Sequence, residues 1–454
     1  MSLVQALPYY PDSSALFSPI AEESWAVFLD SCHDAGAGGR YDILTSSPAT
    51  MLVTRGQVTE IKGPNGSCYS RRDPLEILDE QLAHHESDGS ASELPFLGGA
   101  LGYFAYDLGR RFERLPEITT DDVDIPEMAV GIYDWAVVVD HAAQKSKLVC
   151  ASPTAMSRQT WRRLIDRFSQ PATSREGCRF QALGEIDVTL QREEYAAAFR
   201  RIQRYIHEGD CYQVNLSRRF SVPVKGRAWD AYLHLRRLNP APYAAFMNLP
   251  FVQVLSSSPE RFLHLHNGVV ETRPIKGTRP RSDDPIEDRR LSEELRKSIK
   301  DRAENVMIVD LLRNDLGKSC EIGSIEVPRL FEVESFASVH HLVSTIRGRL
   351  AKGKGATDLL RGCFPGGSIT GAPKLRAMEI IEELEPCRRT LYCGAIGYIG
   401  HDGKMDTNIA IRTLLYKDGI VRFWAGGGIV ADSSEEEEYQ ECAHKVAAIT
   451  PLIR

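Results

Sequence analysis

The stretch V-E-T-R-P-I-K-G-T-R-P-R, at residues 270–281, decides how the fold and the chemistry of this chain are interpreted. Apolar and β-branched residues over 269–275 favour a strand. Pro274 favours an end to regular pairing, and Gly277 lets another group approach the backbone just after Lys276. Lys276 is therefore predicted at the end of a strand, beside an open site where a neutral amine would be a nucleophile. The alternative, a solvated lysine in a turn, is the usual state of lysine and stays open at this point.

The chain has 454 residues, enough for two domains or for one large unit with two sheets. Its hydrophobic fraction of 43% is ordinary for a globular protein, and its net charge of −7 gives no reason to expect nucleic acid or an anionic membrane as a partner. No apolar run is long enough to span a membrane, and the N-terminus lacks the pattern of a secretion signal. The ten cysteines include no C-x-x-C pair, so free thiols in a reducing cytoplasm are expected.

Two regions are expected along the chain. Residues 1–187 form an N-terminal region that contributes strands to the sheet core, among them a strong strand over 129–140, and end in a connector at 152–187. Residues 188–454 form the second region, which begins with a helix over 192–207 that Gly209 closes.

The second region also contains a long helical segment and two hairpins. The helical segment begins near Pro285, pauses near Ser298 and ends near Asp315. The Asp-Gly pairs at 402–403 and 418–419 predict hairpin turns. A further strand is predicted over 408–415, and Ser434 is expected to begin the last helix.

Two helical segments each contain a pair of carboxylates at i, i+3 spacing. Asp301 and Glu304 share one helix face, and Glu438 and Glu441 share another. Clusters of carboxylate oxygens suit Mg²⁺, which commonly completes its shell with water and an anionic substrate. For residues 435–437 we prefer the simpler explanation, an acidic first turn that complements the helix dipole. For Glu441, one turn further along, both explanations stay open.

Two glycine-rich stretches could bind an anion. F-P-G-G-S-I-T-G-A-P-K at 364–374 leads into a predicted helix and offers backbone N–H groups. It is not a Walker A motif, because no Ser or Thr follows Lys374, so a carboxylate ligand fits better than a nucleotide. The glycines at 426–428 form a second such place. Arg412, on the predicted strand 408–415, is either a carboxylate ligand or a surface residue.

Two further side chains are candidates for proton transfer. His341 lies among apolar residues in V-H-H-L-V-S-T, so it is either a structural buried histidine or a general acid/base. Glu260, in S-P-E-R-F, follows a predicted strand and a proline. It is either a general acid or simply the ion-pair partner of Arg261.

Taken together, these motifs resemble the chorismate-utilising enzyme family. The matching pieces occur in one order across residues 190–454, and two N-terminal pieces extend the match over nearly the whole chain: S-P-E-R-F, R-P-I-K-G-T, D-R-A-E-N, H-H-L-V-S-T, F-P-G-G-S-I-T-G-A-P-K, I-R-T, A-G-G-G-I-V-A-D-S and E-Y-Q-E, with G-G-A-L-G-Y-F-A-Y-D and M-A-V-G-I-Y-D-W-A. The resemblance implies an α/β fold of large stacked antiparallel β-sheets with helices outside. Family members that make anthranilate have alanine where this chain has Lys276.

The resemblance also implies a reaction, in which chorismate and ammonia give 4-amino-4-deoxychorismate for folate biosynthesis. Lys276 would add at ring C2 while the C4 hydroxyl leaves with help from Glu260, and ammonia would then displace the lysine. His341 would lie near the ring. Mg²⁺ would bind Glu304 and Glu441, with Glu438 and Asp301 in or near its shell. The residues implied in substrate binding are Gly277, Thr278, Ser368, Thr370, Gly371, Arg412, Gly427, Gly428 and Lys445.

The source of ammonia is expected to be a separate protein. A class I glutaminase needs a cysteine in a motif such as G-x-C-x-G, and Cys393 in L-Y-C-G-A does not fit it. A glutaminase subunit is therefore the expected partner. Two alternatives stay open: formation of anthranilate on the same fold, and a non-catalytic subunit that binds carboxylates.

The resemblance finally implies a possible tryptophan pocket, because related anthranilate synthases bind tryptophan beside the active region. Segments 29–31, 40–42 and 239–246 would form it, with aromatic and proline surfaces around an indole. The side chains proposed for it are Ser31, Tyr41, Pro242 and Tyr243. We expect a pocket that holds tryptophan without regulating the enzyme; the alternative is that these residues only seal one half of the chain against the other.

Overall fold

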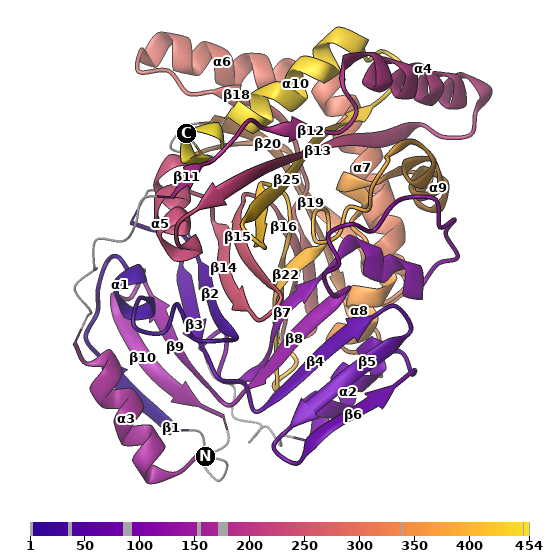
Figure 1. Cartoon of the computed structure of the whole chain (residues 1–454). Helices are drawn as coiled ribbons and strands as arrows, with labels where there is room; N and C mark the ends of the chain where they lie inside the picture. The colour runs from indigo at the N-terminus through magenta and orange to yellow at the C-terminus, as the bar shows by residue number, and fades with distance from the viewer. Residues whose placement is uncertain are drawn as a thin grey trace.

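The computed structural model describes residues 3–34, 39–84, 93–151, 156–170, 180–336, 339–447 and 449–453. In these residues two large antiparallel sheets stack against each other, and helices lie outside them (Figure 1). The fold class that the sequence predicts is therefore confirmed.

The first sheet has 13 strands. Their order is β1 (Leu3–Leu7), β10 (Lys145–Cys150), β9 (Trp135–Asp140), β3 (Tyr41–Thr45), β2 (Ala26–Asp30), β14 (Tyr243–Leu249), β15 (Val252–Ser258), β24 (Thr413–Lys417), β25 (Ile420–Ile429), β13 (Gln213–Lys225) and β11 (Gln181–Ala182), with β12 (Asp187–Val188) and β21 (Gly371–Ala372) paired to β13.

The second sheet has 12 strands. Their order is β18 (Ile275–Pro280), β20 (Val339–Arg349), β17 (Val269–Thr272), β16 (Arg261–His266), β23 (Met405–Ile409), β22 (Ala395–Gly400), β7 (Gly99–Phe104), β8 (Met128–Tyr133), β4 (Thr50–Arg55), β5 (Val58–Gly63) and β6 (Gly66–Ser70), with β19 (Glu326–Ser335) paired to β20.

The helices flank these sheets. They are α1 (Ser14–Phe17), α2 (Pro74–Ala83), α3 (Arg158–Phe168), α4 (Arg192–Glu208), α5 (Ala228–Leu238), α6 (Pro285–Lys297), α7 (Ile299–Gly317), α8 (Ala356–Cys363), α9 (Lys374–Leu384) and α10 (Glu435–Ala447), with short 3₁₀ turns η1 (Tyr106–Arg111), η2 (Gly367–Ile369) and η3 (Thr450–Ile453). Figure 1 shows α4, α6 and α10 together at one end of the molecule, above β18 and β20.

The two predicted regions share both sheets. β2 of the first region pairs with β14 of the second, and β7 pairs with β22. The predicted connector at 152–187 includes α3 and β11, while its residues 152–155 and 171–179 lie outside the described part of the chain. Regions 1–187 and 188–454 are thus joined by continuous strand pairing.

Side chains alternate along a strand, and β2 shows how both faces are buried. Val27 belongs to the large hydrophobic cluster between the sheets. Ala26 and Phe28 belong to a second cluster, which residues of α1, α3 and α5 cover. Strands of this kind are apolar on both faces and appear in the sequence as continuous hydrophobic runs.

Two predicted strands are wrong because the chain changes sheets inside them. The run 129–140 is β8 followed by β9, which belong to different sheets. The run 408–415 is β23 followed by β24, and Arg412 between them has a left-handed φ of 50°. Both strands of each run are buried on both faces, so neither shows an alternation of apolar and polar residues. The sequence therefore gives no sign of where one strand ends and the next begins.

The strand predicted over 269–275 is likewise two strands. β17 ends at Thr272, where Pro274 interrupts it as predicted, but pairing to β20 resumes at Ile275. Lys276 therefore lies within β18 and not after the end of a strand.

Local signals predicted the other elements well. Gly209 closes α4 with a φ of 86°, and α6 and α7 meet at Ser298, whose side chain caps α7. Asp418 and Gly419 both have positive φ in the turn between β24 and β25. Ser434 accepts a hydrogen bond from the Glu437 N–H at the start of α10.

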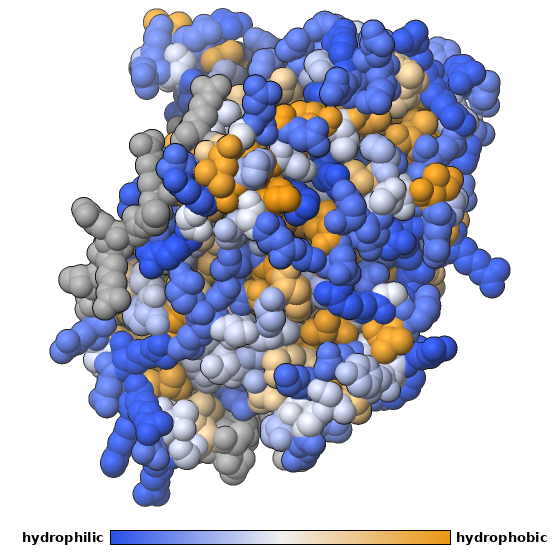
Figure 2. Space-filling model, viewed as in Figure 1, coloured by the Kyte–Doolittle hydropathy of each residue, from blue (hydrophilic) through white to orange (hydrophobic). Residues whose placement is uncertain are grey.

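The surface is mostly polar in the view of Figure 2, where hydrophobic residues form small separate patches. Among the described residues, no helix has both the length and the apolar composition needed to cross a membrane.

Candidate functional site

Lys276 lies on β18 at the end of the second sheet, where α6 and α7 pack against the strand. It is half-buried, and its charge acts on three carboxylates from separate elements. Glu260 follows β15, Glu304 belongs to α7, and Glu441 belongs to α10. The Lys276 ammonium lowers the pKa of each of these carboxyl groups. The structure thus brings the predicted nucleophile and three predicted acidic residues into one site.

Gly277 allows this arrangement. Its φ of 79° favours glycine, and a Cβ there would lie 2.8 Å from both Asp301 Cγ and Leu295 Cδ1. The predicted close approach at Gly277 is therefore made by α6 and α7. It brings the N-terminal part of α7 directly against the strand of Lys276.

Glu260 is 6% exposed and is suited to donating a proton. Its Oε1 accepts a hydrogen bond from Ser368 Oγ at 2.7 Å. Burial raises the pKa of Glu260 to about 7, against the opposing effects of Ser368, Lys276 and the Ile275 N–H. A carboxyl group with a pKa near neutrality can be protonated at the working pH and act as a general acid.

His341 is buried on β20, opposite Thr278 in the strand pairing. Its Nδ1 and Thr278 Oγ1 form a hydrogen bond of 2.9 Å, and the Phe336 ring lies 5.5 Å away, centroid to centroid. Burial, followed by the charge of Arg412, lowers the pKa of His341 to about 4. His341 is therefore a neutral imidazole at neutral pH.

Arg412 lies between β23 and β24, where the chain passes from one sheet to the other. Its Nη1 donates to Asn239 Oδ1 at 3.3 Å, and burial lowers the pKa of the guanidinium. No carboxylate pairs with it among the residues that the structure describes. A half-buried guanidinium with one weak neutral partner is suited to binding a carboxylate ligand.

The loop before α9 folds back on itself. Ser368 faces Glu260, whereas Thr370 is fully buried and its hydroxyl donates to Gly366 O at 3.0 Å. Gly371 pairs with β13, and a Cβ there would lie 2.1 Å from Gln213 O. Of the three predicted loop residues, Ser368 points its side chain into the site, while Thr370 and Gly371 shape the loop.

The remaining predicted residues lie where α10 packs against β25: Glu438, Glu441 and Lys445 on the helix, and Gly427 and Gly428 on the strand. Glu441 forms an ion pair with Lys445 at 2.6 Å, and Lys445 also donates to Gly426 O at 2.7 Å. A Cβ on Gly427 would lie 2.8 Å from Glu438 Oε2. The glycines at 426–428, which lie within β25, thus let the α10 carboxylates approach the strand.

Three of the four predicted metal ligands face one space. Burial raises the pKa of Glu304 and of Glu438. For Glu441, burial is outweighed by Lys445, Lys276 and Lys300 together, so its pKa is lowered. Glu438 Oε1 accepts from Ser433, but its Oε2 is buried without a hydrogen-bond partner. Asp301 is set apart, because Arg279 lies 3.3 Å from its Oδ2.

These carboxylates fit a hard cation by their chemistry, and the unpartnered oxygen of Glu438 is a free ligand. They are not already arranged as a closed metal centre: no group of three or more such side chains is poised to hold an ion among the described residues. Glu441 already forms an ion pair with Lys445, so a metal ion bound by Glu441 would compete with that lysine.

Gln213 belongs to the site but was not predicted. It is 0% exposed on β13, and both atoms of its side-chain amide lack hydrogen-bond partners. A Cβ on Gly428 would lie 2.9 Å from this amide. Buried polar groups are almost always paired, so a ligand between the two glycine-rich stretches would satisfy Gln213. Nothing in the local sequence distinguishes this glutamine.

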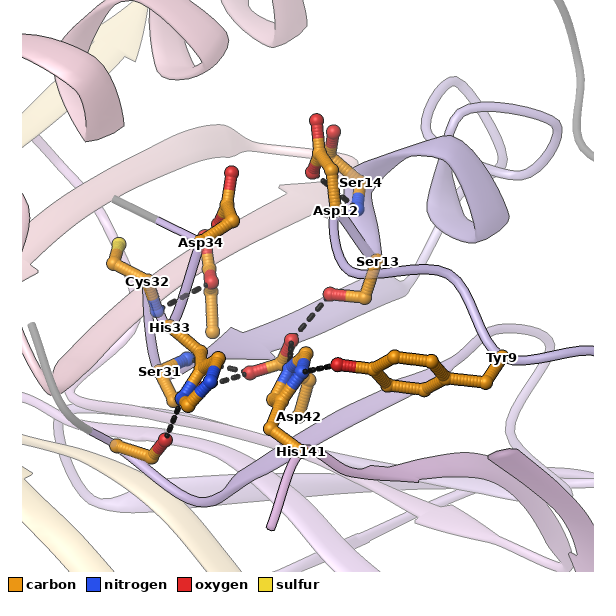
Figure 3. A network of polar contacts seen from close by, with 12 residues as sticks. Tyr9, Asp12, Ser13, Ser14, Ser31, Cys32, His33, Asp34, Asp42 and His141 are labelled. Atoms are coloured by element: carbon orange, nitrogen blue, oxygen red, sulfur yellow. Dashed lines mark hydrogen bonds and ion pairs between the residues drawn. The ribbon is translucent and has the colours of Figure 1, made fainter. Parts of the chain in front are cut away.

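The predicted pocket between the two regions exists as a cavity of about 700 Å³. Ser31, Tyr41, Pro242 and Tyr243 all line it. The Ser31 N–H and hydroxyl both donate to Asp42, at 2.7 and 2.6 Å, within the polar network of Figure 3. The cavity also reaches Ile275, the neighbour of Lys276 on β18.

Comparisons with known proteins agree on one family. The sequence profile of the chorismate binding enzyme family matches residues 32–451. Aminodeoxychorismate synthase component 1 of Klebsiella aerogenes is 49% identical over 446 residues, 98% of this chain and 97% of that protein. Anthranilate synthase component 1 of Thermus thermophilus is 39% identical, over 96% of this chain and 93% of its own length. The crystal structure of anthranilate synthase component I from Streptococcus pneumoniae has a TM-score of 0.79 at 33% identity, covering 91% of this chain and 92% of that one.

The low pKa of His341 predicts a stability loss in mild acid. Below pH 6.5 the unfolded chain protonates this histidine, but the folded protein does so only near pH 4, so the free energy of unfolding falls as the pH falls. From pH 7 to pH 5 the contribution is about 2 kcal/mol. Urea unfolding should show this loss for the wild type and the His266→Gln control, which changes an exposed histidine, and not for His341→Gln. An equal loss in all three proteins would contradict the assignment.

Proposed function

Because the chain belongs to the chorismate binding enzyme family, we propose that it is the synthase component that converts chorismate and ammonia to 4-amino-4-deoxychorismate for folate biosynthesis. The observation that supports this most directly is Lys276 beside Glu260, whose pKa is about 7. The replacement of a hydroxyl by an amine requires a nucleophile and a proton donor for the leaving hydroxyl. The Lys276 amine and a protonated Glu260 are two such groups in one site.

In the proposed reaction the Lys276 amine adds at ring C2, the ring double bond shifts, and the C4 hydroxyl leaves. Glu260 gives its proton to that hydroxyl, which departs as water. Ammonia then adds at C4, the double bond returns, and the bond between C2 and Lys276 breaks. The proton released from ammonia restores Glu260 or Lys276, so the enzyme is regenerated and the enolpyruvyl ether is retained.

The carboxylates of chorismate have several proposed partners. Arg412 offers a guanidinium without a carboxylate partner among the described residues, and Thr278 and Lys445 border the site. Ser368 and the glycines at 427 and 428 are proposed to border the same space, while Gly371 shapes the loop that carries Ser368 and Gly277 shapes the wall. His341, as a neutral imidazole, can accept or donate one hydrogen bond near the ring.

Magnesium is the proposed cofactor. Glu304, Glu438 and Glu441 would hold it, with Asp301 nearby once it leaves Arg279. When bound, the ion would withdraw electron density from the ring through a substrate carboxylate and make the ring a better electrophile. The protein's own part is to hold these carboxylates against β18 and β25.

A class I glutaminase subunit is the proposed partner, in the cytoplasm. Cys393, which comes nearest to a glutaminase motif, is fully buried, and burial raises the pKa of its thiol to about 12. Such a thiol is not a nucleophile at neutral pH. The described cysteines are free, as expected in a reducing compartment.

Anthranilate formation is the main alternative, since related anthranilate synthases have the same fold. Identification by mass spectrometry of the product from chorismate, ammonium and Mg²⁺ separates the two reactions. Anthranilate as the sole product would overturn the proposed function. An absence of turnover would favour a subunit that only binds carboxylates.

Replacement of Lys276 should abolish amination. We expect Lys276→Ala to lower the rate of 4-amino-4-deoxychorismate formation by about 1000-fold or more, because no other amine is attached to β18 at this point. Lys300→Ala is the matched control, since Lys300 also lowers the pKa of Glu304 and Glu441 but lies on α7. The control should retain most of the wild-type rate. A lysine adduct trapped with chorismate and found by peptide mass spectrometry would support the mechanism, whereas a fully active Lys276→Ala variant would refute it.

The acidic cluster should bind Mg²⁺. Glu304→Gln and Glu441→Gln are expected to weaken Mg²⁺ binding by about tenfold or more and to reduce turnover, because each removes a charged oxygen ligand. Isothermal titration with Mg²⁺ measures the binding without turnover. Glu436→Gln, an exposed residue of the same helix that pairs with Arg192, is the control and should bind as the wild type does. Full activity in excess chelator would rule out the metal.

The cavity is proposed to hold tryptophan without regulating the enzyme. Tyr41, Tyr243 and Pro242 offer flat surfaces for an indole. Added tryptophan should raise the melting temperature and leave the initial rate nearly unchanged. Strong competitive inhibition would contradict the second part, and a melting temperature independent of tryptophan would contradict the first.

A further inference from the structure

Lys374, the last residue of the glycine-rich motif, is not used by the proposed mechanism. Its side chain is 13% exposed, at the first position of α9. The Nζ atom lies 2.6 Å from Asp315 Oδ2 and donates to the carbonyl oxygens of Cys363 and Pro365, each at 2.7 Å. Nζ therefore has three oxygen neighbours, of which two are hydrogen-bond acceptors and one is an ion-pair partner, for the three protons of an ammonium group.

The two carbonyls belong to the chain that leads into the loop, and the carboxylate belongs to α7. Asp315 is 2% exposed, near the C-terminal end of that helix. A second lysine, Lys318, also contacts Asp315, at 3.2 Å, but its side chain is 51% exposed and it contacts no part of the loop among the described residues. Lys374 is thus the cation that joins α7 to the loop.

The loop lies between α7 and Glu260. A Cβ on Gly367 would lie 2.7 Å from Leu311 Cδ2, one turn before Asp315 on α7. On the other side, Ser368 donates to Glu260 Oε1. The position of Ser368 relative to Glu260 therefore depends on how the loop is anchored to the helix.

We propose that Lys374 is a positioning residue for Glu260: its ammonium ties the carbonyls of Cys363 and Pro365 to Asp315 and so keeps the Ser368 hydroxyl on the carboxyl group that donates the proton. The proposal rests on the proposed function only for the role of Glu260. The anchoring itself is a property of the folded chain.

The test uses the titration of Glu260. The groups that face it are Lys276 on β18, Lys445 on α10, the Ile275 N–H, Ser368 and the buried thiol of Cys393. Burial raises the Glu260 pKa, and the hydrogen bond from Ser368 opposes that increase. Loss of the hydrogen bond must therefore raise the pKa further. Since the general acid is active when protonated, the fall in rate at alkaline pH should move to higher pH.

The experiment measures kcat against pH at saturating chorismate and Mg²⁺, with the concentration of free ammonia held constant. Ser368→Ala and Lys374→Met should both move the alkaline limb upward, by about one pH unit for the loss of one hydrogen bond to a charged group. The double variant should move it no further than the larger single change, because both act through one contact. Lys318→Met, which removes the other lysine on Asp315, should leave the limb in place.

Hydrogen exchange gives a readout that needs no turnover. Backbone amides of residues 363–371 should exchange faster in Lys374→Met than in the wild type and in Lys318→Met. If Lys374→Met does not fold, Asp315→Asn replaces it; this variant keeps the side-chain shape, weakens the anchor, and should shift the limb in the same direction by a smaller amount.

The outcomes separate the two claims. A wild-type enzyme that does not aminate chorismate overturns the proposed function, and the exchange comparison still tests the anchor. An unmoved alkaline limb in the folded Lys374 or Asp315 variant, additive shifts in the double variant, or unchanged exchange of 363–371 overturns the role of Lys374.

Discussion

The site depends on one constraint: residue 277 must be glycine, which has no side chain. A Cβ there would lie 2.8 Å from atoms of both Asp301 and Leu295, so a larger residue would push α6 and α7 away from β18. Their close packing puts Glu304 within the electrostatic reach of Lys276. A strand from one sheet and a helix outside it come together because of that contact, and the R-P-I-K-G-T motif combines the proposed nucleophile, Lys276, with the glycine that lets the helices approach it.

Carboxylates outnumber lysines around this contact. Glu260, Glu304, Glu438 and Glu441 face a space that Lys276 and Lys445 also border. Burial raises the pKa of all but Glu441, whose lysine partner holds it ionised. Gathering carboxylates away from water is unfavourable unless a cation compensates them. The same arrangement therefore raises the pKa of Glu260 to about 7 and leaves the other three acids chemically suited to a divalent ion.

Much of this could be predicted from the sequence, because the signals are local. The glycine cap at Gly209, the i, i+3 acid pairs, the Asp-Gly turns and the motif around Lys276 each depend on a few neighbouring residues. The errors come from non-local features. Nothing within 129–140 reveals that the chain leaves one sheet for the other, and nothing near Gln213 reveals that its amide is buried without a partner. Asp315, the ion-pair partner of Lys374, lies far from it in the sequence on α7, so no motif could assign this contact.

The cavity and the proposed site lie next to each other along one pair of strands. Ile275 and its pairing partner Val343 line the cavity, whereas Thr278 and its partner His341 border the reactive site. Val343 and His341 are two residues apart on β20 and so share one face of the sheet, and the cavity-lining Phe336 packs against His341. Proximity alone does not couple two sites; a ligand changes the other site only if it favours one of two available arrangements. The ladder between β18 and β20 is held by backbone pairing and by α6 and α7 packed on it, which favours a single arrangement. The proposal that a molecule in the cavity does not regulate the enzyme requires this single arrangement, and inhibition from the cavity would require a second arrangement of the strand pair.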